Sequence, residues 1–167
     1  MKQRTLLALL IAAVVLLVCA THAGDVAAPY KRSDYVLASQ FRKARALVLK
    51  VHARPNGTWY CAYTKRVVKL DDSLDIDHIV PVKYAHAHGL SGLTLVEKRV
   101  FGVDTLNMVQ VLASVNRSKG DDGPSEFMPK ENRCFYAKRW RDVSAKYLIR
   151  VDPADSAALA RQLRYCR

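Results

Sequence analysis

The chain has 167 residues, which allows one ordinary domain with a real hydrophobic core and leaves no length for a second domain. Its 27 Lys and Arg residues outnumber its 15 Asp and Glu residues, which gives a formal net charge of +12. This balance favours polyanionic partners such as nucleic acid, anionic lipid or acidic glycans, and the charge alone does not choose among them.

The N-terminus has the pattern of a secretory signal peptide. Lys2 and Arg4 form a positive segment, Leu6–Val18 is apolar, and Thr21–Ala23 fits a cleavage site. The apolar run is too short to be a comfortable membrane span. We therefore expect residues 1–23 to be removed and residues 24–167 to form an exported domain with no stable membrane association.

The first half of this domain is predicted to hold both helices and strands. Ser33 can cap a helix that runs to about Lys50. Asn56-Gly57 lies between two apolar runs, so a small β-hairpin is predicted within residues 51–68. The next predicted elements are a strand over Asp75–Val80 and a short helix over Val82–His88 that Gly89 ends.

The second half ends in a predicted helix pair. Phe135, Trp140 and Val143 have helical spacing, which indicates core positions. Asp152 and Pro153 are typical of a helix start. The elements predicted here are a helix over Leu95–Phe101, a buried strand over Leu106–Leu112, a helix over Cys134–Tyr147 and a last helix that begins after Asp152.

Three cysteines remain after the signal peptide, and export to an oxidising compartment permits a disulfide. Cys134 opens one predicted helix and Cys166 closes the last, and these two ends lie side by side in an antiparallel helix pair. We therefore prefer a Cys134–Cys166 bridge, which leaves Cys61 as a buried thiol or an intermolecular partner. A zinc site is the rival interpretation, although the chain has no Cys-x-x-Cys spacing to support it.

The stretch Leu74–Pro81 places a carboxylate and an imidazole side by side between β-branched residues. In a strand, the Asp77 and His78 side chains should point in opposite directions. Two further polar clusters, at Asn107 and at Val115–Asp121, follow apolar stretches and can close on this one.

These residue types suit phosphodiester hydrolysis, which needs a base, a cation and help for the leaving oxygen. His78 can act as the base, because imidazole titrates near neutrality. Asp77 and Asn116 offer oxygen ligands for a hard divalent cation. Lys119 can set a point charge against the phosphate, and Asn107 can orient the His78 loop through backbone hydrogen bonds.

The same residues resemble the HNH branch of the His-Me finger, or ββα-metal, nucleases. The resemblance is closest to secreted bacterial members related to the C-terminal domain of GmrSD-type restriction enzymes, and it runs from about Trp59 to Cys166. The matching motifs are Asp77-His78-Ile79-Val80-Pro81, Leu106-Asn107-Met108, Asn116-Arg117-Ser118-Lys119-Gly120-Asp121 and Pro124-Ser125-Glu126-Phe127-Met128-Pro129.

The resemblance implies a ββα-metal core. With the small β-hairpin and the flanking helices predicted above, including the C-terminal helix pair, the expected fold class is α+β. The resemblance also implies that His78 is the general base, that Asp77 and Asn116 bind the metal, and that Asn107 is the middle Asn of the motif. Asn116 stands where many HNH enzymes have a final His, and Phe127 replaces the usual Trp. Ligation through oxygen alone favours Mg²⁺ or Mn²⁺ over zinc or nickel.

The resulting expectation is a secreted, monomeric, metal-dependent endonuclease that cuts DNA, or else RNA, without sequence specificity. Two alternatives stay open. One is a non-catalytic basic protein that binds extracellular polyanions; the other is an antibacterial toxin with the same chemistry, which an adjacent immunity protein would distinguish.

The roles of Asp75, His86 and His88 are also predicted from the sequence. Asp75 can support the site from behind Asp77 or cap a turn. His86 and His88 are two residues apart and are expected at the surface.

Two sequons, Asn56-Gly57-Thr58 and Asn116-Arg117-Ser118, bear on the source. A glycan on Asn116 would block the metal site, so we hypothesise export through a bacterial pathway, in the extracellular space or periplasm. A glycopeptide with sugar on Asn116 would contradict this.

Overall fold

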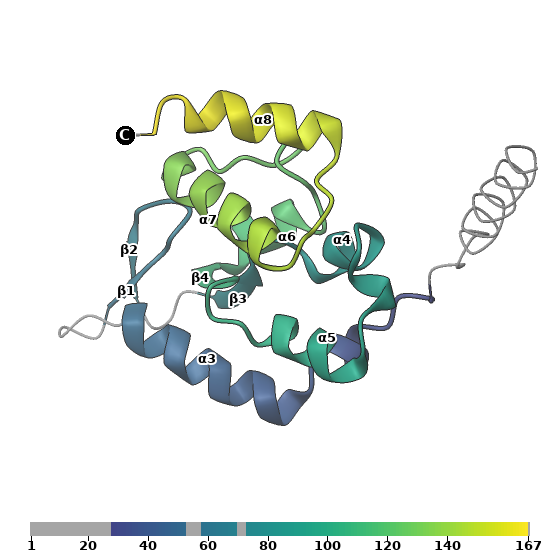
Figure 1. The fold of residues 1–167 in the computed structure, drawn as a ribbon. Coiled ribbons are helices and arrows are strands. Elements are labelled where there is room, and N and C mark those ends of the chain that lie inside the picture. Colours follow the sequence, from purple (N-terminus) through teal and green to yellow (C-terminus); the bar gives the residue numbers. More distant parts are fainter. Residues whose placement is uncertain (1–27, 53–57, 70–72, 167) are drawn as a thin grey trace, which may run out of the picture.

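The computed structural model describes residues 28–52, 58–69 and 73–166, so the expected signal peptide at 1–23 lies outside the described residues. The fold is mixed α+β, as predicted. Within the described residues it holds seven α-helices and two small antiparallel sheets (Figure 1). No helix among those residues is long and apolar enough to cross a membrane.

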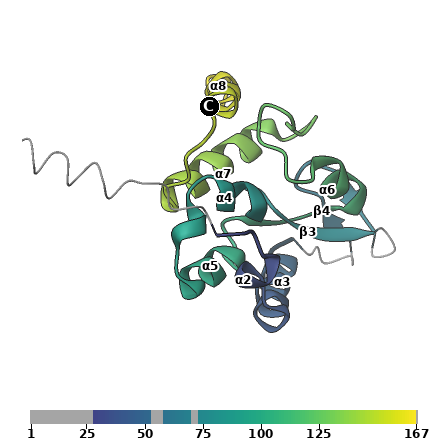
Figure 2. The same cartoon turned by 90° about the vertical axis from the view of Figure 1, so that its right-hand side faces the viewer.

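The central sheet is a pair of antiparallel strands, β3 (Leu74–His78) and β4 (Met108–Leu112). In their register Asp77 faces Val109 and His78 faces Met108. Helix α6 (Ala113–Lys119) follows β4 directly. Figure 2 shows α6 and α3 (Ala38–His52) on opposite sides of the strand pair. The two predicted strands therefore form, but each is shorter than expected at one end.

The second sheet is a hairpin of β1 (Trp59–Tyr60) and β2 (Val67–Val68). A hairpin was predicted, but its turn was assigned to Asn56-Gly57, which lies outside the described residues and before β1. The chain turns instead between Cys61 and Arg66, where the Cys61 amide donates to the Arg66 carbonyl (2.9 Å). Lys65 supplies the positive φ of 54° that this turn needs.

The predicted helix over Ser33–Lys50 is two helices, α2 (Arg32–Tyr35) and α3. The chain becomes extended at Val36, with φ −123° and ψ 97°. The cause is Tyr35, whose side chain is fully buried and whose hydroxyl lies 2.8 Å from Nδ1 of His86. Tertiary burial of this one ring therefore overrides the local helical pattern.

Two short helices lie between the strands, and both were predicted. They are α4 (Val82–Ala87) and α5 (Leu95–Gly102), with a 3₁₀ turn η1 (Leu90–Gly92) between them. Gly89, with φ 134°, lets the chain leave α4. Thr94 and Glu97 form a capping box that starts α5.

The expectation that both histidines are at the surface is wrong for His86. The His86 side chain is 6% exposed, and its Nε2 donates to the Ala28 carbonyl (2.7 Å). His88 is partly exposed and its Nε2 donates to a carboxylate oxygen of Asp152 (3.0 Å). The two rings therefore connect α4 and the residue that follows it to the segments around Ala28 and Asp152 through hydrogen bonds.

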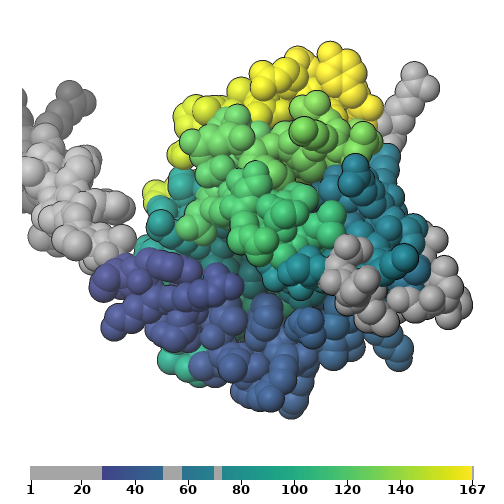
Figure 3. All heavy atoms as spheres, turned by 180° about the vertical axis from the view of Figure 1, so that it is seen from behind, coloured from purple at the N-terminus to yellow at the C-terminus, as the bar shows by residue number. Residues whose placement is uncertain are grey.

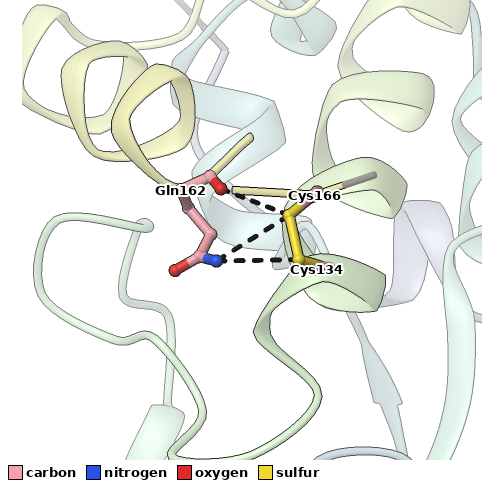
Figure 4. The surroundings of a disulfide bond; sticks show 3 residues. All are labelled: Cys134, Gln162 and Cys166. Carbon is pink, nitrogen blue, oxygen red and sulfur yellow. Dashed lines mark hydrogen bonds between the residues drawn. A yellow bond between two sulfur atoms is a disulfide. The ribbon is translucent and has the colours of Figure 1, made fainter. Parts of the chain in front are cut away.

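The C-terminal helix pair consists of α7 (Arg133–Lys146) and α8 (Pro153–Leu163), as predicted. The disulfide joins Cys134 at the start of α7 to Cys166 after α8, which confirms the preferred pairing (Figure 4). Cys61 is the buried thiol that this pairing left over. Trp140 of α7 is fully buried in the main hydrophobic core, together with Val109 of β4.

Candidate functional site

The predicted site residues lie on β3, at the start of β4 and on α6, and Asn107 directly precedes β4. Side chains alternate along β3, and both faces are used. Asp75 and Asp77 point toward α6, where Asn116 and Lys119 contact them. His78 points the other way, toward α3, and its ring lies 6.1 Å from the ring of Phe41. The adjacent carboxylate and imidazole therefore diverge, as the sequence predicted.

Asp77 is held by two side chains. Its Oδ1 accepts a hydrogen bond from Nζ of Lys119 (3.0 Å), and its Oδ2 accepts from the Tyr63 hydroxyl (2.5 Å). Burial, followed by the charge of Asp77, raises the pKa of Tyr63 well above its usual value. The hydroxyl is therefore protonated and donates to Asp77. A carboxylate oxygen has two lone pairs, so Asp77 keeps an acceptor position on each oxygen.

Lys119 does not occupy the position expected of it. It was predicted to set a charge against the substrate phosphate, but its side chain is fully buried. The ammonium donates to Asp77 and to the carbonyl oxygen of His78 (2.9 Å). Lys119 therefore holds two consecutive residues of β3 from the helix side.

The imidazole of His78 has a defined tautomer. Its Nε2 lies 2.9 Å from the carbonyl oxygen of Gly102, and a carbonyl can only accept, so the proton is on Nε2. Nδ1 is left with a lone pair that can accept a proton. Burial lowers the pKa of His78, outweighing the opposing effects of the Gly102 carbonyl and of Asp77. The neutral ring, which a general base requires, is therefore favoured at neutral pH.

The Asn107 side chain forms two hydrogen bonds with the loop that follows His78. Its Oδ1 accepts from the Val80 amide (2.8 Å) and its Nδ2 donates to the Val80 carbonyl (3.0 Å). Its own carbonyl accepts from the Ile79 amide (2.8 Å). Because the side chain is fully buried, these bonds are shielded from water. The backbone contacts expected of Asn107 are thus present, and its contribution to catalysis stays a prediction.

Asn116 is oriented by Asp75. Its Nδ2 donates to Oδ2 of Asp75 (3.1 Å). This bond does not use the amide oxygen Oδ1, which is the atom that could bind a cation. The sequence left Asp75 as either a supporting residue or a turn cap, and this bond places it behind Asn116. The sequon at Asn116 lies within α6. The other sequon begins at Asn56, outside the described residues.

One pocket of about 180 Å³ brings the predicted residues together. Asp77, His78 and Asn116 line it, whereas Asn107 and Lys119 support it from behind. Arg32 of α2 also lines the pocket, and sequence reasoning missed it because α2 is 45 residues from Asp77 along the chain. Its complete lining is Arg32, Ile76, Asp77, His78, Pro81, Val82, Asn116, Gly120 and Asp121.

Tyr63 and Gly102 were missed for the same reason. A Cβ at Gly102 would overlap the Tyr35 carbonyl, so α2 can approach α5 only because this residue is glycine. In the sequence, Tyr63 is one of several aromatic residues near the β-hairpin. Neither position carries a local signal for the site.

The donor set fits a hard divalent cation rather than zinc. The pocket offers a carboxylate from Asp77 and an amide oxygen from Asn116, the ligand types that Mg²⁺ and Mn²⁺ prefer. In the part of the chain that the structure describes, His, Cys, Asp and Glu side chains form no group of three that could hold a metal. Water would therefore have to complete the coordination of any ion held by these two residues.

The chain is similar in sequence to a fungal secreted protein. No family model matches the chain. A protein of Arthroderma benhamiae described as an uncharacterized secreted protein is 30% identical over 118 residues, which is 68% of this chain and 58% of that protein. The chain thus spans a little over half the length of this relative. The relative is fungal, so the comparison does not support the bacterial origin that we expected.

Proposed function

We propose that the protein is a secreted, metal-dependent endonuclease of the HNH, ββα-metal type, which hydrolyses phosphodiester bonds in DNA or RNA, with DNA as the preferred substrate. The observation that carries the proposal is the pocket at the end of β3. A histidine, an aspartate and an asparagine line this pocket, and among the described residues the histidine Nδ1 has no hydrogen-bond partner. The aspartate and the asparagine can hold a cation. The order β3–β4–α6 and the packing of α6 on both strands agree with a ββα core.

His78 has the properties of a general base. The hydrogen bond to Gly102 holds the proton on Nε2, so Nδ1 can take the proton of an attacking water molecule. The positive charge that the ring then gains lies near the carboxylate of Asp77, which moderates its cost. The water oxygen attacks phosphorus, and the bond to the leaving sugar oxygen breaks.

Asp77 and Asn116 would hold the cation. Mg²⁺ or Mn²⁺ bound there would neutralise charge on the phosphate and help the leaving oxygen depart. Lys119 and Tyr63 fix the Asp77 carboxylate, and Asp75 fixes the Asn116 amide. The ligands are therefore oriented before substrate arrives, which lowers the reorganisation that catalysis requires.

The net charge supports non-specific cleavage, and the N-terminal sequence and the fungal relative support secretion. A formal net charge of +12 suits phosphate contacts that carry no sequence information, which favours non-specific cleavage. The apolar N-terminal run and the name of the fungal relative support secretion. The same charge also favours the second candidate, a non-catalytic protein that binds polyanions.

Plasmid digestion tests the two candidates against each other. The purified protein is incubated with supercoiled plasmid and Mg²⁺ or Mn²⁺, with EDTA and His78→Ala as controls. His88→Ala serves as a matched variant, because that ring pairs with Asp152 away from the pocket. We expect cleavage by the wild type and by His88→Ala, and none with EDTA or with His78→Ala.

The second candidate, a non-catalytic polyanion-binding protein, predicts a different outcome. Salt-sensitive DNA and RNA binding that persists in EDTA and in His78→Ala, with no cleavage of either substrate, favours the polyanion-binding candidate.

A further inference from the structure

We propose that Arg32 binds the substrate phosphate in the pocket that holds His78. The inference rests on the proposed nuclease function and assigns the role that Lys119 was expected to fill. It extends the site beyond β3, β4 and α6 to α2, a segment that lies before the region of family resemblance.

The pocket itself points to Arg32. Of the described residues that line it, Arg32 is the one Lys or Arg, and its side chain is exposed. Lys119, in contrast, is fully buried against Asp77. Asp121 also lines the pocket, but its carboxylate lies 3.6 Å from the ammonium of Lys83. A phosphate that enters therefore meets its fixed positive charge at Arg32.

Arg32 is held at the pocket by a rigid anchor. Tyr35 lies three residues further along α2, where its fully buried side chain donates a hydrogen bond to the Leu90 carbonyl (3.2 Å). The Tyr35 backbone packs directly on Gly102, where any side chain would overlap it. Gly102 is also the residue whose carbonyl fixes His78. The same glycine thus positions the base and the segment that carries the arginine.

Figure 3 gives the corresponding view of the surface. The purple surface of the N-terminal described residues lies beside the green surface of the region around α6. Arg32 of α2 and Asn116 of α6 line the same pocket as the end of β3, so a nucleic-acid backbone that reaches His78 would contact both segments.

Arginine is chemically suited to this position. Its planar guanidinium donates two parallel hydrogen bonds to phosphate oxygens and stays charged at all relevant pH values. Negative charge on those oxygens is greatest in the transition state, so a donor placed there accelerates the reaction more than it tightens binding. An exposed lysine elsewhere on the surface would affect mainly affinity.

The experiment compares Arg32→Ala, Arg32→Lys and Lys31→Ala. Lys31 is the matched control, because it is exposed, adjacent in sequence and not part of the pocket lining. Cleavage of a labelled duplex with Mg²⁺ gives kcat and KM, and binding of the same duplex in EDTA gives Kd. Denaturant unfolding of each variant checks the fold.

We expect kcat of Arg32→Ala to fall about 10²- to 10³-fold, as for removal of a transition-state donor. Its Kd should change little more than that of Lys31→Ala. Arg32→Lys should retain part of the rate, and added guanidinium ion at millimolar concentration should restore part of the rate of Arg32→Ala. The unfolding midpoints should match the wild type, because the side chain is exposed.

Two results would overturn the inference. One is a wild-type kcat in Arg32→Ala, whatever its Kd, and the other is a fall in kcat of Lys31→Ala as large as that of Arg32→Ala. If His78→Ala is inactive in the same assay, the nuclease function stands and only the role of Arg32 fails. A wild type that cuts neither DNA nor RNA overturns both proposals.

Discussion

Nε2 of His78 lies 2.9 Å from the carbonyl oxygen of Gly102, so the candidate base is oriented by a residue 24 positions away. Gly102 of α5 also packs directly against the Tyr35 backbone of α2. One backbone position therefore serves two parts of the site.

Gly102→Ala should destabilise the protein, because the new methyl group overlaps the Tyr35 backbone. We expect a loss of about 1–3 kcal/mol in the free energy of unfolding, the usual cost of overpacking. Urea denaturation measures this loss. Gly92→Ala is the control, since a Cβ there meets nothing within 4 Å. Equal stability of the two variants would contradict the close approach of α2 to α5.

Removing Lys119 should cost more than removing a surface lysine. Lys119→Met leaves the Asp77 carboxylate buried without its cationic partner, and breaking such a pair typically costs about 3–5 kcal/mol. Lys83→Ala breaks an exposed pair with Asp121 and should cost no more than about 1 kcal/mol. The free energies of unfolding from guanidinium titrations should separate the two variants clearly. Similar values would argue against a buried pair.

Asn107→Ala should destabilise the protein, because the loop after His78 loses its hydrogen bonds to the Asn107 side chain. The amide and carbonyl of Val80 would lose their partners in a buried setting, at about 1–3 kcal/mol for each group. Chemical denaturation should detect this loss. Proteolysis of the native state should also become faster near Val80, because the loop opens more often. Unchanged stability would show that water replaces the side chain at this position.

The acid stability of the protein should depend on Asp104. Burial opposes ionisation, but hydrogen bonds from Lys146, Tyr147 and the Leu106 amide together hold the pKa of Asp104 below its ordinary value of 3.8. A depressed pKa contributes stability that is complete above the unfolded value and is lost as the pH falls through the folded value.

Asp104→Asn should therefore be less stable than the wild type at neutral pH. The difference should shrink below about pH 4, where the wild-type carboxylate takes up its proton. Thermal melts between pH 2.5 and pH 7 measure this trend. A gap that stays constant with pH would contradict the assignment.

The disulfide should contribute substantially to stability. It joins residues 32 positions apart, and a loop of that length corresponds to about 3–4 kcal/mol in the chain-entropy model. A double variant with Ser at Cys134 and Cys166 should lose most of this, as judged by its denaturation midpoint. Treatment of the wild type with a reductant should give a similar shift.

Much of the fold was predictable because its signals are local. The capping box at Thr94, the proline at the first position of α8 and the alternating pattern of β3 each fix an element through neighbouring residues. The Cys134–Cys166 pairing followed from the helix ends that the two cysteines occupy. Asn107 was predictable because a buried amide next to a strand must find backbone partners.

The failures share a different cause. The break between α2 and α3 depends on where the Tyr35 ring is buried, and the burial of Lys119 depends on how α6 docks on β3. A basic residue in an Asn-x-x-Lys motif looks the same in sequence whether it faces solvent or core. Arg32 and Tyr63 join the site through contacts between distant segments, which a pattern within one segment does not encode.

The reactivity of the buried Cys61 thiol can report how often the β-hairpin opens. The side chain is fully buried in the main core, and both other described cysteines are in the disulfide. A thiol-reactive dye added to the folded mature protein should therefore label Cys61 only while the hairpin is separated from the core. The labelling rate then reports the frequency of that opening without any engineered probe.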